Sequence, residues 1–212
     1  MFRCYLFSVS IILLLGSVSL DARSSGEEII RALELAPNPE NGKTIYLLCA
    51  SCHHDNGWGK SDGSFPVIAG QHRRVLIKQL ADIRAKLRDN PVMYPFSDPE
   101  TIGGAQAISD VAAYIAGLPS DPAPGQGDGK ELVTGKTIFQ DKCSACHGEQ
   151  AQGNDDAFIP RLRGQHYAYL LRQIQGIRSG YRKNSNPAMA ALVKSLSVPE
   201  MEAVADYVSR LQ

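Results

Sequence analysis

The sequence predicts an all-α protein built from two similar domains in tandem. One short motif, C-x-x-C-H, occurs at residues 49–53 and again at residues 143–147. Segments on both sides of the motif also recur, in the same order and 93 to 96 positions later. Such internal repetition indicates two copies of one structural unit. Apolar residues follow helix-face spacing in both copies and no convincing alternating strand pattern occurs, which predicts helices throughout.

The amino-terminal segment has the parts of a secretory signal peptide. Arg3 lies in a short basic head, an apolar run follows over residues 5–20, and small or polar residues surround positions 19–22. We therefore expect residues 1–22 to be a signal peptide and the mature protein to be exported to the periplasm. An uncleaved membrane anchor is the alternative, although the run is shorter than the roughly 20 apolar residues that span a bilayer.

The remaining cysteines all belong to the two motifs. Cys4 leaves with the signal peptide, so no disulfide is expected in the mature protein. The formal net charge is zero, and no basic stripe indicates a nucleic-acid partner. The motif cysteines are Cys49, Cys52, Cys143 and Cys146.

The spacing of each motif fits covalent haem attachment. On one helical turn, cysteines at positions i and i+3 share a face and can bond the two vinyl groups of a haem. The histidine that follows, His53 or His147, then lies under the porphyrin as an axial ligand of the iron. A zinc ribbon would need two pairs roughly 15 to 20 residues apart, and a thioredoxin-like site needs a βαβ pattern; neither is found. We predict two covalently bound haem c groups, which would also complete the marginal cores of two small domains.

The repeat also sets the predicted domain boundaries. Residues 119–130 contain turn-forming residues and almost nothing apolar, which is typical of a linker. We predict an N-terminal domain at residues 23–118 and a C-terminal domain at residues 131–212, and we interpret small changes of offset as short loop insertions. The matching segments are 42–46 with 135–139, Pro66 with Pro160, 70–72 with 164–166, and 90–93 with 186–189.

Helices are expected at equivalent places in the two copies. One precedes each motif, one follows it with an amphipathic pattern, and one closes each domain. A further helix is expected over residues 27–35, with Ser25 and Glu28 placed as a capping box. The amphipathic positions are Leu76, Leu80, Ile83, Leu87, Leu170, Ile174, Ile177 and Tyr181, and the closing helices are expected at 111–118 and 204–211.

The sixth ligand of each iron should occur at matching places in both copies. Two pairs meet this condition, the methionines Met93 and Met189 and the histidines His72 and His166. We favour the methionines, because a whole amphipathic helix separates them from the proximal histidine and can carry the chain around the haem. The histidines begin that helix, only 19 residues after the proximal ligand in both copies, and we interpret them as helix-start or surface residues.

Other candidate residues have more ordinary interpretations. Met201 has Thr101 as its nearest match, so a core or helix-surface role is expected, and His54 is interpreted as a surface group because its counterpart is Gly148. Pro66 and Pro160 each follow the proximal histidine by 13 residues. We expect their carbonyl groups to accept from the histidine Nδ1 and fix the orientation of the ring.

The chain resembles the di-haem cytochrome c4 family over nearly all of the mature protein. The resemblance lies in the paired motifs, the Gly-Gln-His before a helix, residues 179–184 ahead of the Asn-Pro-Ala-Met segment, and residues 205–208. It implies two class I cytochrome c folds related by pseudo-twofold symmetry, histidine and methionine on both irons, and electron delivery toward a terminal oxidase. The first copy departs from the pattern after Met93, where residues 94–104 are longer and richer in turn residues than the counterpart.

These observations favour a one-electron carrier over an enzyme. Two protein ligands on each iron leave no open site for substrate or oxygen. The expected partners are redox proteins, with electrons passing from a bc1-type quinol-oxidising complex or a dehydrogenase to a terminal oxidase, and with loose association at the membrane surface. The alternative is the electron-transfer subunit of a periplasmic dehydrogenase acting on sulfide, thiosulfate or an alcohol. A di-haem peroxidase would need one iron with a displaceable ligand, and the matched methionines argue against it.

Overall fold

The computed structural model describes residues 20–212, with side chains from residue 25 onward. The predicted signal peptide therefore lies outside the described residues apart from its last three positions, and its cleavage stays a prediction. Among the described residues, no helix has the length and apolar character needed to cross a membrane.

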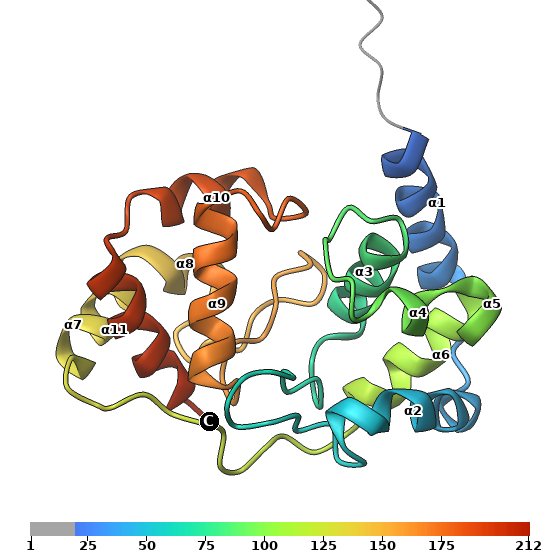
Figure 1. Ribbon diagram of the computed structural model, residues 1–212, viewed down its shortest axis with the longest axis horizontal. Coiled ribbons are helices and arrows are strands. Elements are labelled where there is room, and N and C mark those ends of the chain that lie inside the picture. Colours follow the sequence, from blue (N-terminus) through green and yellow to red (C-terminus); the bar gives the residue numbers. More distant parts are fainter. Residues whose placement is uncertain (1–19) are drawn as a thin grey trace, which may run out of the picture.

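The described chain forms two helical units joined by an extended segment, as Figure 1 shows. No strand forms within residues 20–212, where only an isolated bridge pairs Asn154 with Ile159. The all-α prediction is thus confirmed. The N-terminal unit contains α1 (Leu20–Glu34), α2 (Pro39–His53), α3 (Arg73–Arg84), α4 (Tyr94–Ser97), α5 (Pro99–Ile102) and α6 (Ala105–Ala116). The C-terminal unit contains α7 (Leu132–Ile138), η1 (Phe139–Cys143), α8 (Ser144–His147), α9 (Tyr167–Arg178), α10 (Pro187–Lys194) and α11 (Val198–Ser209).

Each unit has a small apolar core of its own. In the N-terminal unit, Tyr46, Ile77 and Ile108 from α2, α3 and α6 form its centre. In the C-terminal unit, Phe139 and Leu170 take the corresponding role, and Met201 lies among them with only 1% of its surface exposed. The interpretation of Met201 as a core residue is therefore confirmed.

A glycine in each copy explains how the helix that leads to the motif crosses the last helix of its unit so closely. A Cβ atom on Gly42 of α2 would lie 2.2 Å from the carbonyl oxygen of Asp110 in α6, and one on Gly135 of α7 would lie 2.1 Å from that of Ala203 in α11. Neither distance is compatible with a side chain. The repeated glycine ahead of each motif thus allows the contact between the two helices.

The two copies reach their motifs by different helices. In the first, α2 runs without a break through the whole motif to His53. The second has one more residue between its repeated glycine, Gly135, and its first cysteine, and this residue is taken up by the π-helical turn η1 between α7 and α8. Our interpretation of offset changes as loop insertions is wrong at this position, because a π turn adds a residue without ending the helix.

The predicted helix over residues 27–35 is longer than expected. α1 begins at Leu20, so Ser25 lies inside the helix and is not its N-cap. Its buried hydroxyl donates to Asp82 Oδ1 at 2.8 Å, and Glu28 pairs with Arg84. The capping-box prediction is therefore wrong: the two polar side chains bind α3 instead of the first turn of their own helix.

The segment between α6 and α7 contains no helix but is fixed to the C-terminal unit. The buried Asp206 of α11 accepts from the backbone amides of Gly127 at 3.1 Å and Gly129 at 2.7 Å. The amide of Gly125 donates to His166 Nδ1 at 3.0 Å. These bonds restrain the connection, and so help to define how the two units sit together.

Candidate haem sites

The first motif lies in the last turns of α2. The Sγ-bearing residues Cys49 and Cys52 are three positions apart on this helix, both partly buried, and His53 is its last residue. His54 follows at φ 62° and ψ 165°, a backbone region that is almost restricted to glycine. The chain turns away at this residue, and the carbonyl of His54 accepts from the Tyr46 hydroxyl at 2.7 Å.

The second motif begins at the end of η1 and continues through α8. Cys143 ends the π turn, Cys146 is exposed, and His147 is the last residue of α8. Gly148 then makes the same turn at φ 80° and ψ 157°, with no side chain to strain it. The two motifs thus present the same three groups in the same order.

Both motif histidines are buried and oriented by a proline carbonyl. His53 is 5% and His147 is 7% exposed. The Nδ1 atom of His53 donates to the Pro66 carbonyl at 3.0 Å, and that of His147 donates to the Pro160 carbonyl at 3.1 Å. These are the contacts expected from the sequence, and they leave Nε2 of each ring as the nitrogen available to a metal.

The protonation states of these groups suit haem attachment. Burial lowers the pKa of His53 and of His147, although the bond to the proline carbonyl opposes this, so both rings are neutral near pH 7. Burial also raises the pKa of the Cys49 thiol to about 11 and that of Cys143 to about 11. All four thiols are free. Two free thiols and a neutral imidazole in each unit are the donor set that a covalent haem requires.

The candidate methionines lie at related but unequal places. Met93 precedes α4, whereas Met189 lies in the first turn of α10, where Asn186 caps the helix by accepting from the amide of Ala188 at 2.8 Å. Both are partly buried. After Met93 the chain forms two four-residue helices, α4 and α5, in place of the single helix α10. Their ligation of iron stays a prediction.

The two histidines of the Gly-Gln-His segments contact the opposite unit. His72 precedes α3 and His166 precedes α9, as expected of helix-start residues, but both rings also make contacts with protein. His166 is 2% exposed and its Nε2 donates to the Trp58 carbonyl at 2.7 Å, while His72 Nε2 lies 2.8 Å from the Gln152 carbonyl. The surface interpretation of His166 is therefore wrong, because the approach of the two units buries it.

Arginine and glutamine side chains meet where the units touch. Arg88 Nη1 donates to Gln79 Oε1 at 2.9 Å, and Arg182 Nη1 donates to Gln173 Oε1 at 2.9 Å. Each arginine also reaches across, Arg182 to Gln79 at 3.2 Å and Arg88 to Gln173 at 3.4 Å. Burial lowers the pKa of Arg182 to about 10. The paired contacts have the twofold relation that the resemblance implied. Arg182 lies in the 179–184 segment that carries the resemblance, but no role in the contact between the units was expected for it or for the other three residues.

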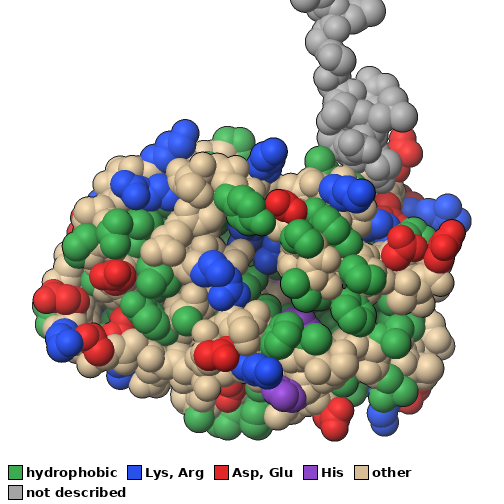
Figure 2. Space-filling view, viewed as in Figure 1, with side chains coloured by type: hydrophobic (Ala, Val, Ile, Leu, Met, Phe, Trp, Pro, Cys, Tyr) green, Lys and Arg blue, Asp and Glu red, His purple; other side chains and the backbone are tan. Residues whose placement is uncertain are grey.

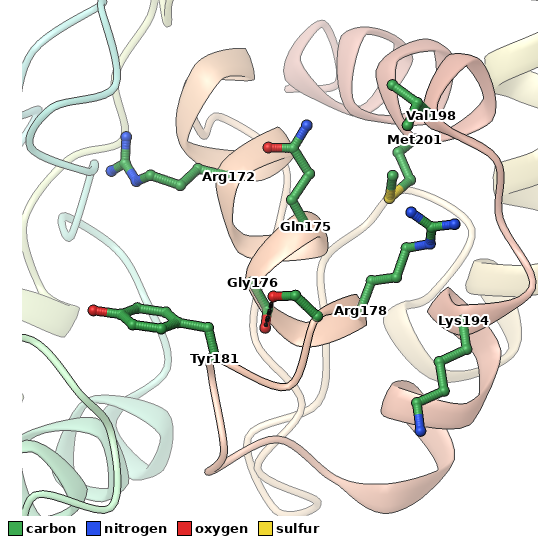
Figure 3. Close-up of a pocket in the computed structure, with 9 residues that line it drawn as sticks. Arg172, Gln175, Gly176, Arg178, Tyr181, Lys194, Val198 and Met201 are labelled. Atoms are coloured by element: carbon green, nitrogen blue, oxygen red, sulfur yellow. Dashed lines mark hydrogen bonds between the residues drawn. The ribbon is translucent and has the colours of Figure 1, made fainter.

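One open hollow of about 680 Å³ lies beside α9 (Figure 3). Arg172 and Tyr181 extend from it toward the N-terminal unit, and Met201 enters from α11. No motif cysteine, motif histidine or candidate methionine lines it, so we do not assign it to a haem. Its lining residues are Arg172, Gln175, Gly176, Arg178, Ser179, Tyr181, Lys194, Val198 and Met201.

Comparison with known proteins decides the family. The cytochrome c family model matches the chain twice, over residues 39–119 and 132–212. Cytochrome c4 of Stutzerimonas stutzeri is 31% identical over 198 residues, which cover 83% of this chain and 90% of that protein. The chain belongs to the di-haem cytochrome c4 family. It accordingly carries two covalently bound haem c groups and is an electron carrier, as the sequence predicted.

Two further relatives of this cytochrome c4 chain are informative. A protein of Stutzerimonas stutzeri strain A1501 described as a thiosulfate dehydrogenase electron acceptor is 32% identical over 197 residues, covering 82% of this chain and 88% of its own. The crystal structure of reduced recombinant cytochrome c4 from Pseudomonas stutzeri superposes with a TM-score of 0.75 at 30% identity, covering 84% of this chain and all of that one. The prediction of two tandem cytochrome c domains is confirmed.

Proposed function

We propose that Cys49, Cys52, Cys143 and Cys146 bind the two haems through thioether bonds, and that His53 and His147 are the proximal iron ligands. The main support is the repeated arrangement of two free thiols, a buried neutral imidazole and a carbonyl bonded to its Nδ1. Pro66 and Pro160 supply that carbonyl. Each fixes the ring through Nδ1, which leaves Nε2 to hold the iron and would make the imidazole a better donor.

Met93 and Met189 are the proposed sixth ligands. A thioether stabilises reduced iron and raises its potential relative to a second imidazole. Of the rival pair, His166 is disfavoured because its Nδ1 accepts from the amide of Gly125 while its Nε2 donates to the Trp58 carbonyl, which leaves neither nitrogen free. His72 Nε2 is likewise turned to the Gln152 carbonyl in the other unit. With His53 and Met93 holding one haem iron and His147 and Met189 the other, the bound haems would supply one-electron chemistry and the chain would offer no site for a substrate at iron.

The proposed role is periplasmic electron transfer from a quinol-oxidising complex or a dehydrogenase to a terminal oxidase. Support comes from membership of the cytochrome c4 family and from the relative described as an electron acceptor of thiosulfate dehydrogenase. Positive and negative side chains are interspersed on the face in Figure 2, and hydrophobic side chains lie between them. Such a mixed surface suits brief association with more than one redox partner.

A turnover assay tests this role directly. Oxidised protein would be mixed with quinol and a bc1-type complex, and the reduced form with membranes that contain a terminal oxidase. We expect both haems to be reduced in the first mixture faster than by quinol alone, and to be reoxidised in the second faster than in the absence of the membranes. Failure of both reactions, with both haems intact by their spectra, would contradict the proposal.

The second candidate is the electron-transfer subunit of a periplasmic dehydrogenase. It is favoured by the same thiosulfate dehydrogenase electron acceptor. The two roles differ in the permanence of the interface, because a subunit remains bound to its partner at low concentration. Size-exclusion chromatography of the native protein discriminates them: elution as a free protein of about 23 kDa or less supports the carrier, and stable co-elution with a catalytic chain supports the subunit.

A further inference from the structure

The glutamines of the two Gly-Gln-His segments reach across the domain boundary. Gln165 Oε1 accepts from the amide of Val67 at 3.0 Å, and its Nε2 donates to the Val67 carbonyl at 2.7 Å. Gln71 makes the same two hydrogen bonds with Arg161: its Oε1 accepts from the Arg161 amide and its Nε2 donates to the Arg161 carbonyl, each at 2.9 Å. Gln71 and Gln165 are equivalent residues 94 positions apart, and so are the residues that they bind. Each glutamine thus holds the same residue of the opposite domain.

The held residue directly follows the proline that orients a motif histidine. The amide N–H of Val67 and the carbonyl of Pro66 belong to one peptide group, and that carbonyl accepts from His53 Nδ1. In the other domain, the peptide group between Pro160 and Arg161 joins His147 to Gln71 in the same way. A single planar peptide group therefore separates each glutamine from the histidine of the other domain.

The glutamines are well placed to hold these groups firmly. Gln165 is 8% exposed, and its Oε1 also accepts from the amide of His166 at 3.0 Å. Gln71 Oε1 accepts likewise from the amide of His72 at 3.0 Å. Each side chain is thus fixed at the start of α9 or α3, and both of its amide atoms are used.

Hydrogen bonds along such a chain polarise one another. When a peptide N–H donates to an acceptor, its carbonyl becomes a stronger acceptor. A stronger bond from Nδ1 makes the imidazole more basic, which favours the oxidised iron that it binds. Loss of the glutamine should therefore raise the reduction potential of the haem in the opposite domain.

We propose that Gln71 and Gln165 are reciprocal positioning residues, each of which holds the peptide group that orients the iron-ligand histidine of the other domain and so sets part of the other haem's reduction potential. The inference rests on the proposed ligation by His53 and His147. Because the contact is made twice, it predicts two separate effects, one in each direction.

The test uses the full di-haem protein with Gln165→Leu and Gln71→Leu. NMR redox titration follows haem methyl signals assigned to each domain. Gln165→Leu should shift the reduction equilibrium of the N-terminal haem about threefold toward the reduced form, with the C-terminal haem unchanged. Gln71→Leu should shift the C-terminal haem toward the reduced form to the same extent and leave the N-terminal haem unchanged. Because Gln71 is less buried, this variant keeps the test decisive if the first one folds poorly.

Tyr169→Phe is the matched control. Its hydroxyl accepts from Arg88 across the same boundary at 2.8 Å, but it touches neither peptide group. This variant removes one neutral hydrogen-bonding group and should move neither potential. The inference is overturned if each glutamine variant moves the haem of its own domain, if neither potential moves, or if the control shifts them equally.

The wild-type spectrum separates this result from the function itself. If both wild-type haems are low-spin with a histidine ligand and the glutamine variants behave like wild type, the cross-domain inference fails and the electron-carrier proposal stands. If the wild-type haems lack histidine ligation, both are overturned.

Discussion

The N-terminal and C-terminal domains present the same attachment motif on differently built supports. The first domain carries its motif on the unbroken helix α2, and the additional helix α1 packs against α3 and α6. The second reaches its motif through the π turn η1 and has the linker, pinned by Asp206, in the place of α1. The geometry at the motif was kept while the surrounding structure diverged. The difference shows which features the haem chemistry requires and which it leaves free.

The largest effect is expected from deleting one residue of α2, with the corresponding deletion in η1 as its comparison. Deletion of the exposed Asp141 from η1 should convert the π turn into an α-helical one of the length found in α2, so that both haems remain attached. Deletion of the exposed Leu47 from α2 should rotate the first motif by about 100° relative to Gly42 and abolish attachment of that haem. Haem content per chain by the pyridine haemochrome assay distinguishes two groups from one. Loss of a haem in both deletions would contradict the view of η1 as a tolerated insertion.

The next effect concerns the methionines. Met189→Ala and Met93→Ala should each open one iron to exogenous ligands and lower that haem's potential, on the order of 100 mV, because a soft ligand to reduced iron is lost. Imidazole or cyanide titration, followed optically, measures the opening. Met201→Ala is a control for a lost core methionine, since Met201 is 1% exposed and has Thr101, not a methionine, as its nearest match in the first copy. If Met93→Ala retains its low-spin methionine signals, the assignment of Met93 as the ligand of that iron is contradicted.

A smaller effect is expected where the chain leaves each motif. His54→Gly should stabilise the N-terminal domain by about 1 kcal/mol, because its φ and ψ suit only glycine. Gly148→Ala should destabilise the C-terminal domain by about 1 to 2 kcal/mol for the same reason, and its Cβ would lie 2.3 Å from the Gln152 side chain. Urea unfolding monitored at each haem gives both values. Changes of opposite sign in the free energy of unfolding would support the comparison of the two motifs. A loss of stability in His54→Gly would refute the assignment of backbone strain to His54.

The smallest effect is the part of the acid dependence that Asp110 contributes to the N-terminal domain. Burial by itself raises the pKa of Asp110, but hydrogen bonds from Asn41, the amide of Asn38 and Gln106 outweigh it and lower that pKa. The ionised carboxylate therefore adds stability that is fully present above about pH 4 and is lost as the pH falls through the lowered value. The C-terminal domain has Ala203 at this position.

Asp110→Asn should accordingly flatten the acid dependence of N-terminal unfolding and leave the other domain unchanged. Unfolding midpoints measured between pH 2 and about 6 provide the check. An unchanged acid dependence in the variant would show that other carboxylates control this transition.

Much of the architecture could be predicted because it depends on local signals that occur twice. The motifs, the helices after them and the proline carbonyls all follow from spacing within one copy, and the repeat tests each of them. Ser25 was misinterpreted because its partner, Asp82, is 57 positions away and a local capping pattern was available. The π turn was missed because an insertion in sequence looks the same in a helix as in a loop.

The contacts between the domains could not be predicted from one copy. The Gly-Gln-His segment was visible as a repeat, but nothing within a domain accounts for the burial of His166 or for the two hydrogen bonds between Gln165 and Val67. Both depend on how the two domains dock. A repeated polar segment without a partner in its own domain is the signal that could have indicated an interface.

The proposed function depends on histidine and methionine being the two axial ligands of each iron, so that each domain carries one electron. The most direct measurement is the far-red methionine charge-transfer band of the oxidised wild-type protein, quantified per haem alongside its spin state. We expect two low-spin haems with one such band each, bleached in two one-electron steps on reduction. A high-spin signal or a missing band at either haem would contradict it.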